Sequence, residues 1–440
     1  MQTTRTASHP HETDVAVVGG GLAGLTAATL LARTGRHVML FEKSHTLGGR
    51  AVTHVHGDFR FNLGPHALYR SGPGIEVLRA LGIRFSGGTP PVAGAYAIDG
   101  GVKHTLPGGF VSLLTTGLLR LPAKFELARL LGAVQKIDAQ AIQDLTVREW
   151  LAGAIRHPDV RRLVQALLRL STYANDPERQ SAGAALAQLQ LALSSGVTYL
   201  DGGWQVLVDG LRDAARTAGV QILSGTRVTA IEHDRILRGV RLADDTRIAV
   251  SNVVIAAAPS DAVAVLPESV VLREWNAAAI PIKAACLDVA LSRLPQPRAT
   301  FALGIDQPLY LSVHSAVAKL AAPGGATIHV AKYLPAGRPT DAKADERELE
   351  ATLDLVQPGW RDVVVERRYL PSMIVSHALV TAAAGGIAGR PSPAVPDVAG
   401  AYVVGDWVGR DGMLADASLA SAKQAATLIM QRDARHAAAA

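Results

Sequence analysis

Residues 14–25 read DVAVVGGGLAGL, an apolar run that predicts a buried strand, followed by a glycine-rich turn and the start of a helix. Within it, Gly19, Gly21 and Gly24 have the spacing G-x-G-x-x-G. The first glycine permits a tight turn, the second lets a pyrophosphate approach the backbone, and the third lets the helix pack closely on the strand. The helix start, at Leu22 and Ala23, would then turn its positive end toward the phosphates. The stretch therefore predicts a Rossmann-type dinucleotide site.

An acid at the end of the next strand supports this interpretation. The helix is expected over residues 22–33, ending before Gly35, and a second strand over residues 37–42 ends at Glu42. At that position a carboxylate accepts hydrogen bonds from the ribose hydroxyls of an adenosine. The alternative is a glycine-rich turn that binds no ligand, but such a turn does not account for the strand, the helix and the acid in this order.

The residues after Glu42 indicate which dinucleotide is bound. Residues 42–50 read EKSHTLGGR, which resembles the second signature of the flavin amine oxidase superfamily, a group that includes monoamine oxidases, protoporphyrinogen oxidases and phytoene desaturases. The resemblance implies bound FAD, with Lys43 and Gly49 in the site and Arg50 beside the diphosphate. A guanidinium is a suitable counter-charge for two phosphates. The alternative for Arg50 is a solvated loop arginine.

A second family motif lies near the other end of the chain. Residues 400–418 read GAYVVGDWVGRDGMLADAS and resemble the C-terminal flavin motif, although an ordinary strand-to-helix turn is the alternative. The resemblance implies that Asp406, after Gly405, accepts a hydrogen bond from a ribityl hydroxyl. It also implies that the backbone of residues 412–414 faces the pyrimidine edge of the flavin, where a helix N-terminus stabilises negative charge. Those three residues are Gly412, Met413 and Leu414.

Three shorter segments also match the family. FNLGPH at residues 61–66 would bring Gly64, Pro65 and His66 near the flavin, GGW at 202–204 opens a helix, and the backbone of Val228 would touch adenine. By this placement His66 is the candidate catalytic residue, as a general acid or base, and simple packing is the equal alternative. Lys283 could hold a water at the flavin, but its apolar surroundings favour a lysine on a strand that extends to solvent.

The motifs resemble the phytoene desaturase and protoporphyrinogen oxidase branch more than the amine oxidases. Amine-oxidising members carry one wall of an aromatic cage just before the last helix, where this chain has Gly412 and Met413. The implied reaction is dehydrogenation of a largely apolar small molecule by hydride transfer to noncovalent FAD. Because only one dinucleotide fingerprint is evident, oxygen or a quinone is the expected oxidant. A flavin amine oxidase, a non-redox FAD-dependent isomerase and an FAD-binding module without turnover remain alternatives.

Composition excludes several other classes. The 440 residues are 48% hydrophobic and 5% aromatic with a net charge of +6, which fits an ordered enzyme, and no basic run indicates nucleic-acid binding. No metal is expected, because His54, His56 and His66 lack further ligands at suitable spacing.

The single cysteine, Cys286, is expected to be a buried side chain, in a protein that resides in a reducing compartment. Residues 1–12 lack the apolar core of a secretory signal, and no apolar run is long enough to span a membrane.

A cytoplasmic protein is therefore expected, with peripheral membrane contact as an option. The segment 110–134 is apolar with Arg120, Lys124 and Arg129 interspersed, so it could form core, a substrate lid or a face that rests on a membrane. The oligomeric state is not indicated by the sequence.

The expected fold class is α/β, α+β overall, with a Rossmann-type FAD-binding domain, an inserted helical domain and a mixed-sheet substrate domain. After a flexible tail at 1–13, the FAD-binding domain comprises residues 14–95, 196–270 and 395–440, the last part ending in a closing helix. A helical cap occupies 96–195 and the sheet-containing substrate domain 271–394.

Overall fold

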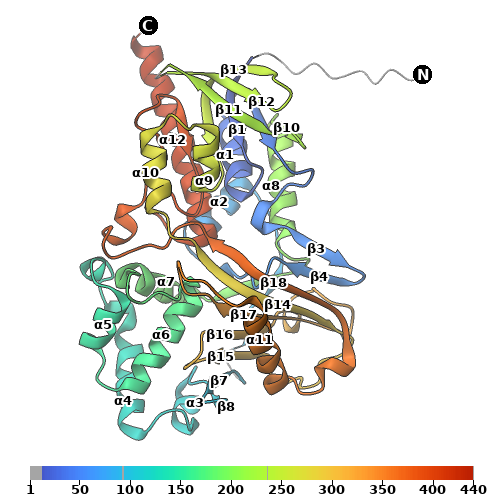
Figure 1. Ribbon diagram of the computed structural model, residues 1–440, viewed down its shortest axis with the longest axis vertical. Coiled ribbons are helices and arrows are strands. Elements are labelled where there is room, and N and C mark those ends of the chain that lie inside the picture. The colour runs from blue at the N-terminus through green and yellow to red at the C-terminus, as the bar shows by residue number, and fades with distance from the viewer. Residues whose placement is uncertain (1–11, 92–93, 235, 440) are drawn as a thin grey trace.

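The computed structural model describes residues 12–91, 94–234 and 236–439 (Figure 1). The helices are α1 Leu22–Ala32, α2 Pro73–Leu81, α3 Phe110–Thr115, α4 Leu121–Ala133, α5 Val147–Ala154, α6 Pro158–Thr172, α7 Ala182–Ser195, α8 Gln205–Thr217, α9 Pro259–Val265, α10 Val270–Ala278, α11 Ala342–Val356 and α12 Leu414–Ala439. The strands are β1 Glu12–Val18, β2 Val38–Glu42, β3 Thr53–His56, β4 Phe59–Asn62, β5 Leu68–Tyr69, β6 Gly87–Gly88, β7 Tyr96–Asp99, β8 Val102–Thr105, β9 Val197–Leu200, β10 Gln221–Ser224, β11 Val228–His233, β12 Leu237–Leu242, β13 Arg247–Ile255, β14 Ile282–Leu291, β15 Phe301–Gly304, β16 Leu309–Val313, β17 Ala326–Tyr333, β18 Val364–Ser376 and β19 Ala401–Val403.

The first sheet has the Rossmann arrangement that the glycine motif predicts. Its strand order is β10-β2-β1-β13-β12-β11, and β19 also pairs with β13. The pairs β1–β2, β2–β10, β1–β13 and β13–β19 are parallel, whereas β12 pairs antiparallel with both β11 and β13. The predicted tail of residues 1–13 falls mostly outside the described residues, and its last two residues form the start of β1.

Both faces of this sheet are covered, which explains the continuous apolar runs at the end of β1 and in β2. Val15 and Val17 of β1 face a core that includes residues of α1, α2, α8 and α12. Ala16, between them, faces the opposite core, which includes residues of α9 and α10. The alternation follows from the two-residue period of a strand. In Figure 1 this part of the protein occupies the upper half, with the end of α12 at the top.

The second sheet has the order β18-β14-β17-β16-β15-β7-β8 and is mixed, because β15 and β7 are parallel and its other pairs are antiparallel. The mixed substrate sheet was therefore predicted correctly in type. Residues 96–105, assigned from sequence to the helical cap, instead form the hairpin β7–β8. Gly100 and Gly101 lie at its turn with φ of 58° and 75°, a conformation that favours glycine.

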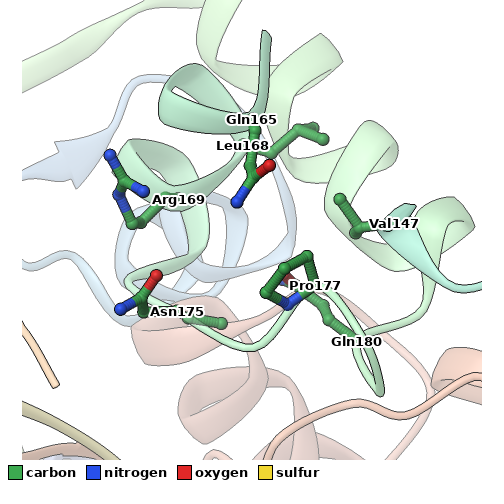
Figure 2. A pocket seen from close by; sticks show the side chains of 8 residues that line it. Val147, Gln165, Leu168, Arg169, Asn175, Pro177 and Gln180 are labelled. Carbon is green, nitrogen blue, oxygen red and sulfur yellow. The ribbon is translucent and has the colours of Figure 1, made fainter. Parts of the chain in front are cut away.

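Helices α3–α7 form the predicted helical segment, beside the second sheet in the lower part of Figure 1. Their core also includes Leu303 and Ile305 from the region of β15. A small cavity lies in this region, shown in Figure 2, where Arg169, Asn175 and Gln180 contribute polar groups. At about 10 Å³ it has room for about one water molecule, so it is not a substrate site. Among the described helices, none has both the length and the apolar character needed to cross a bilayer.

Candidate active site

A cavity of about 730 Å³ brings the two flavin signatures together. Its volume falls within the range of ligand and cofactor pockets in proteins. The predicted cofactor residues that line it are Gly19, Gly21, Leu22, Ala23, Glu42, Lys43, Gly49, Arg50, Pro65, His66, Val228, Gly405, Asp406 and Leu414. The predicted residues Gly24, Gly64, Gly412 and Met413 are not part of the lining.

The three glycines of the first motif act in different ways. A Cβ at Gly19 would lie 2.4 Å from the carbonyl oxygen of Ala256, and one at Gly24 would lie 1.9 Å from the carbonyl oxygen of Gly19. Both glycines therefore allow close packing of the turn, helix and sheet. A Cβ at Gly21 would meet no protein atom closer than 3.9 Å. Since Gly21 lines the cavity at the start of α1, the missing side chain leaves room for a ligand phosphate at the helix N-terminus.

The carboxylate of Glu42 accepts hydrogen bonds from two backbone N–H groups, one in the glycine-rich turn and one just after β2. Its Oε2 accepts from the N–H of Gly20 at 2.7 Å and its Oε1 from the N–H of Ser44 at 2.8 Å. Each carboxylate oxygen can accept a further hydrogen bond, so the group can still receive ribose hydroxyls. The adjacent Lys43 forms an exposed ion pair with Asp261 at 3.6 Å.

Arg50 and Asp406 lie within the same hydrogen-bonded cluster. Nη1 of Arg50 donates to Oδ2 of Asp406 at 2.8 Å and to the carbonyl oxygen of Val375 at 2.7 Å. His377 approaches the other carboxylate oxygen, with 3.0 Å between its Nδ1 and Oδ1 of Asp406. Despite the burial of Asp406, Arg50 and His377 hold the pKa of this carboxyl well below its usual range. Asp406 is therefore an ionised anchor that fixes Arg50 at the cavity wall.

Arg390 fixes the loop between β19 and α12, a role that sequence reasoning missed. Its guanidinium donates to the carbonyl oxygens of Asp406 at 3.2 Å and Gly412 at 2.8 Å. Burial lowers its pKa to about 10, so it remains charged at neutral pH. Met413 packs away from the cavity against Ala184 and Val380. Of the three residues predicted at the pyrimidine edge, Leu414 is therefore the one that reaches the cavity.

His66 lines the cavity, but its ring nitrogens face protein carbonyls. Nδ1 lies 3.1 Å from the carbonyl oxygen of Gly64, and Nε2 lies 3.1 Å from that of Arg50. Burial lowers the pKa of His66 to about 4, so the ring is neutral at pH 7 and can donate to only one of these carbonyls. The ring also packs edge-on against Trp204, with 4.9 Å between centroids. Of the two roles left open by the sequence, this geometry favours packing over acid–base chemistry.

The inner wall of the cavity contains residues that no sequence motif predicted. Ser372, Met373, Ile374 and Val375 of β18 line it, as do Tyr69 and Tyr173. Tyr173 has φ of 60°, an uncommon conformation for a non-glycine residue, and its hydroxyl donates to the carbonyl oxygen of Pro65 at 3.1 Å.

Three further tyrosines lie buried behind this wall: Tyr199, Tyr310 and Tyr333. Tyr173 packs edge-on against Tyr333 with ring centroids 5.7 Å apart. Aromatic side chains therefore gather at and behind this end of the cavity, although they make up only 5% of the chain. A low aromatic content says nothing about where the few aromatic side chains gather.

The other residues considered from the sequence, a lysine, the cysteine and two histidines, lie outside the cavity lining. Lys283 is exposed on β14 and outside the cavity lining, as its surroundings predicted. Cys286 is buried beside Gly64, where an added Cβ would meet its Sγ at 2.9 Å. His54 and His56 lie on β3, and no group of three or more potential metal ligands occurs among the described residues.

Fold and site together define a dinucleotide-binding oxidoreductase of the flavin type. The family model of flavin containing amine oxidoreductases matches residues 22–282, more than half of the chain. The chain therefore belongs to this family.

Two relatives illustrate the range of the family. AofH of Mycobacterium tuberculosis, named as a flavin-containing monoamine oxidase, is 30% identical over 277 residues, which span 59% of this chain and 60% of that protein. Phytoene dehydrogenase of Streptomyces griseus is 27% identical over 264 residues, half of each chain. This chain thus matches about half to three fifths of the length of these curated relatives.

Solved structures show the same fold over nearly the whole chain. An oxidoreductase from Methanosarcina mazei superimposes with a TM-score of 0.75 at 17% identity, covering 95% of this chain and all of the other. Cyclohexylamine oxidase from Brevibacterium oxydans gives a TM-score of 0.69 at 18% identity, covering 96% and 100%. At these identities the likeness concerns the fold alone, and it confirms the predicted fold class.

Proposed function

We propose that this protein dehydrogenates a largely apolar small molecule, with noncovalent FAD as the electron acceptor and oxygen or a quinone as the final oxidant. The observation that carries the proposal is the cavity of about 730 Å³, which joins the dinucleotide motif to the apolar residues of β18. When bound, FAD supplies a two-electron acceptor for a hydride from carbon, while the second hydrogen leaves the substrate as a proton.

The chain's own residues suit this cofactor. Gly21 leaves space at the N-terminus of α1 for a diphosphate, and Glu42 in the same cavity can accept hydrogen bonds from the adenosine ribose. Arg50, also in the lining, offers a positive charge to the diphosphate. Noncovalent binding is favoured because the thiol of Cys286 lies outside the cavity lining. We further infer that β18 and Pro65 keep water from the reacting carbon and that His66 positions the loop around Pro65.

Charge in the cavity favours an apolar substrate over an amine. Asp406 is already paired with Arg50 and His377. The carboxyl of Asp416, also in the lining, has its pKa raised to about 7 by burial, so much of it is neutral at pH 7. A substrate ammonium would therefore find little fixed negative charge, whereas Met373, Ile374 and Val375 offer apolar contact.

Amine oxidation is the second candidate, and the tyrosines support it. Tyr69 and Tyr173 line the cavity and could provide the aromatic surface that a neutral amine needs. The name of AofH corresponds to amine oxidation, and the name of phytoene dehydrogenase corresponds to dehydrogenation of an apolar molecule.

Anaerobic mixing of the FAD-loaded protein with two panels of compounds would decide between them. One panel contains isoprenoid and other apolar compounds, and the other contains primary and secondary amines. We expect bleaching of the flavin absorbance by a member of the apolar panel. Rapid bleaching by amines with the apolar panel inert would establish the amine oxidase instead, and bleaching by neither panel would favour an isomerase or a binding module. Release of the yellow colour on acid precipitation would confirm noncovalent FAD.

A further inference from the structure

Helices α3 and α4 expose an unusual concentration of large apolar side chains. Phe110, Val111 and Leu114 of α3 are 77%, 72% and 54% exposed, and Leu121 and Phe125 of α4 are 63% and 70% exposed. The other exposed large apolar residues of the described chain are distributed over many separate elements. Single exposed apolar residues are normal, but a concentrated group indicates an interaction surface. We refer to these five residues as the α3–α4 face.

The fold holds the α3–α4 face outward. Leu113 of α3 and Ala123 and Leu127 of α4 are buried in the core of the helical segment, which fixes the opposite sides of both helices toward solvent. Nζ of Lys124 donates to the carbonyl oxygen of Leu114 at 2.6 Å and joins the two helices. In Figure 1 both helices lie at the lower end of the molecule, remote from α12 and the first sheet. The apolar side chains are therefore not a lid on the flavin cavity.

Basic residues are frequent in the segment that contains this face. Residues 101–136 contain Lys103, Arg120, Lys124, Arg129 and Lys136 against a single acid, Glu126. The carboxylate of Glu126 is directed to the start of α6, where it accepts from the backbone N–H groups of Arg156 at 2.7 Å and His157 at 2.8 Å. The salt bridges of the described structure are formed by other residues, and none of them includes one of these five basic side chains. Residues 101–136 thus carry an excess of positive charge whose side chains take part in no salt bridge of the described structure.

We propose that the α3–α4 face docks on the surface of a lipid bilayer that contains anionic lipids. Two phenylalanines and three aliphatic residues can enter the boundary between headgroups and acyl chains, while the lysines and arginines of the same segment pair with lipid phosphates. No described helix is suited to crossing the bilayer, so the contact is peripheral. A symmetric dimer through the same face would bring this excess of basic residues opposite its own copy, which disfavours a second copy of this chain as the occupant.

Vesicle sedimentation of the FAD-loaded protein tests the proposal, with phosphatidylcholine vesicles compared with vesicles that contain one third phosphatidylglycerol. At low salt we expect binding to the anionic vesicles and at least tenfold weaker binding to the neutral ones. Raising the salt to 0.5 M should also weaken binding, because it shortens the screening length. Arg120→Gln/Lys124→Gln/Arg129→Gln should lower the partition coefficient on the order of 100-fold, and Phe110→Ser/Phe125→Ser at least about tenfold.

Matched variants elsewhere on the surface serve as controls. Arg79→Gln/Arg84→Gln/Arg216→Gln removes three exposed charges from the FAD-binding part, and Val55→Ser/Val270→Ser removes two exposed apolar residues. Neither should change vesicle binding by more than about twofold, and all variants should retain bound FAD as a sign of correct folding. Absence of binding to anionic vesicles, or equal loss in the control variants, would overturn the proposal. Concentration-dependent dimerisation that Phe110→Ser/Phe125→Ser abolishes, without vesicle binding, would assign the face to a second copy.

Discussion

Nη1 of Arg50 donates to Oδ2 of Asp406 at 2.8 Å and thereby joins two motifs that lie 356 residues apart in the sequence. Asp406 is almost fully buried and Arg50 is partly exposed toward the cavity. Because the pair links the segment after β2 to the segment after β19, the cavity wall depends on both being in place. His377, just beyond β18, adds a third segment to the same cluster.

Breaking this pair should weaken FAD binding. Asp406→Ala leaves the Arg50 guanidinium without its partner at the cavity wall, so we expect FAD affinity to fall about 10- to 100-fold. The variant Arg50→Gln should lose a similar factor, since the diphosphate loses its counter-charge. In the double variant the two losses should not multiply, because the residues act as a unit. Fluorescence titration of the apoprotein with FAD measures all three, and strictly multiplicative losses would show that the two residues act independently.

The extent to which the sequence predicted this site depends on how local each signal is. Gly21 and Glu42 belong to one β-α-β unit, so their roles followed from a short continuous pattern. Arg50 and Asp406 were each predicted as cofactor residues, but their contact with one another was not, because it depends on how distant segments meet.

The strand β18 gave no clear sequence signal at all. Its residues VVERRYLPSMIVS include Glu366, Arg367, Arg368 and Pro371, which interrupt any apolar alternation. The strand lies at the edge of its sheet, where a proline is tolerated, and it exists through its pairing with β14. Its cavity-lining residues were missed for that reason.

A side chain at Gly21 should remove FAD while leaving the fold intact. Gly21 has φ of −79° and ψ of −175°, which any residue adopts, so Gly21→Val introduces bulk without backbone strain. We expect at least a 100-fold loss of FAD affinity, because the isopropyl group would occupy the space for the diphosphate. Gly153→Val is the matched control, since a Cβ there meets nothing within 4 Å. Full retention of FAD by folded Gly21→Val, measured by absorbance at a fixed protein concentration, would contradict the dinucleotide assignment.

His66 should act as a positioning residue. An amide side chain has two N–H donors and can serve both the Gly64 and Arg50 carbonyls, so His66→Gln should keep the rate of anaerobic flavin reduction within about fivefold. His66→Ala should lose more, because the loop is no longer held. If His66 were a general acid or base, His66→Gln would instead lose about 10²- to 10⁴-fold and one limb of the pH profile would vanish. Stopped-flow reduction from about pH 4, near the lowered pKa of His66, to pH 9 distinguishes the two results.

The last prediction concerns Asp416, in the first turn of α12. Its carboxyl is buried, accepts a hydrogen bond from the backbone of Gly74 at the start of α2, and leaves Oδ2 without a hydrogen-bond partner in the described structure. Burial, with a smaller contribution from Glu76, raises its pKa to about 7. In the unfolded chain the pKa of an aspartate is about 3.9.

The sign of the pH effect follows from this difference. The folded protein holds the proton more tightly than the unfolded chain, so the contribution of Asp416 to stability is fully present below pH about 3.9 and is lost as the pH rises through about 7. Asp416→Asn is neutral at every pH and cannot lose it. The free energy of unfolding of the variant, relative to the parent, should therefore increase between pH 4 and 7 by a few kcal/mol at most and then level off above pH 7.

Urea unfolding of both proteins at a series of pH values measures this difference. Asp58→Asn changes an exposed carboxyl and should show no such trend. An Asp416→Asn protein that is destabilised by a constant amount at all pH values would show that the carboxyl is ionised and that its hydrogen bond to Gly74, rather than its burial, dominates its energetics. A difference that grows with pH would establish that α12 begins, beside the flavin cavity, with a carboxyl that is protonated in the folded protein at acidic to neutral pH.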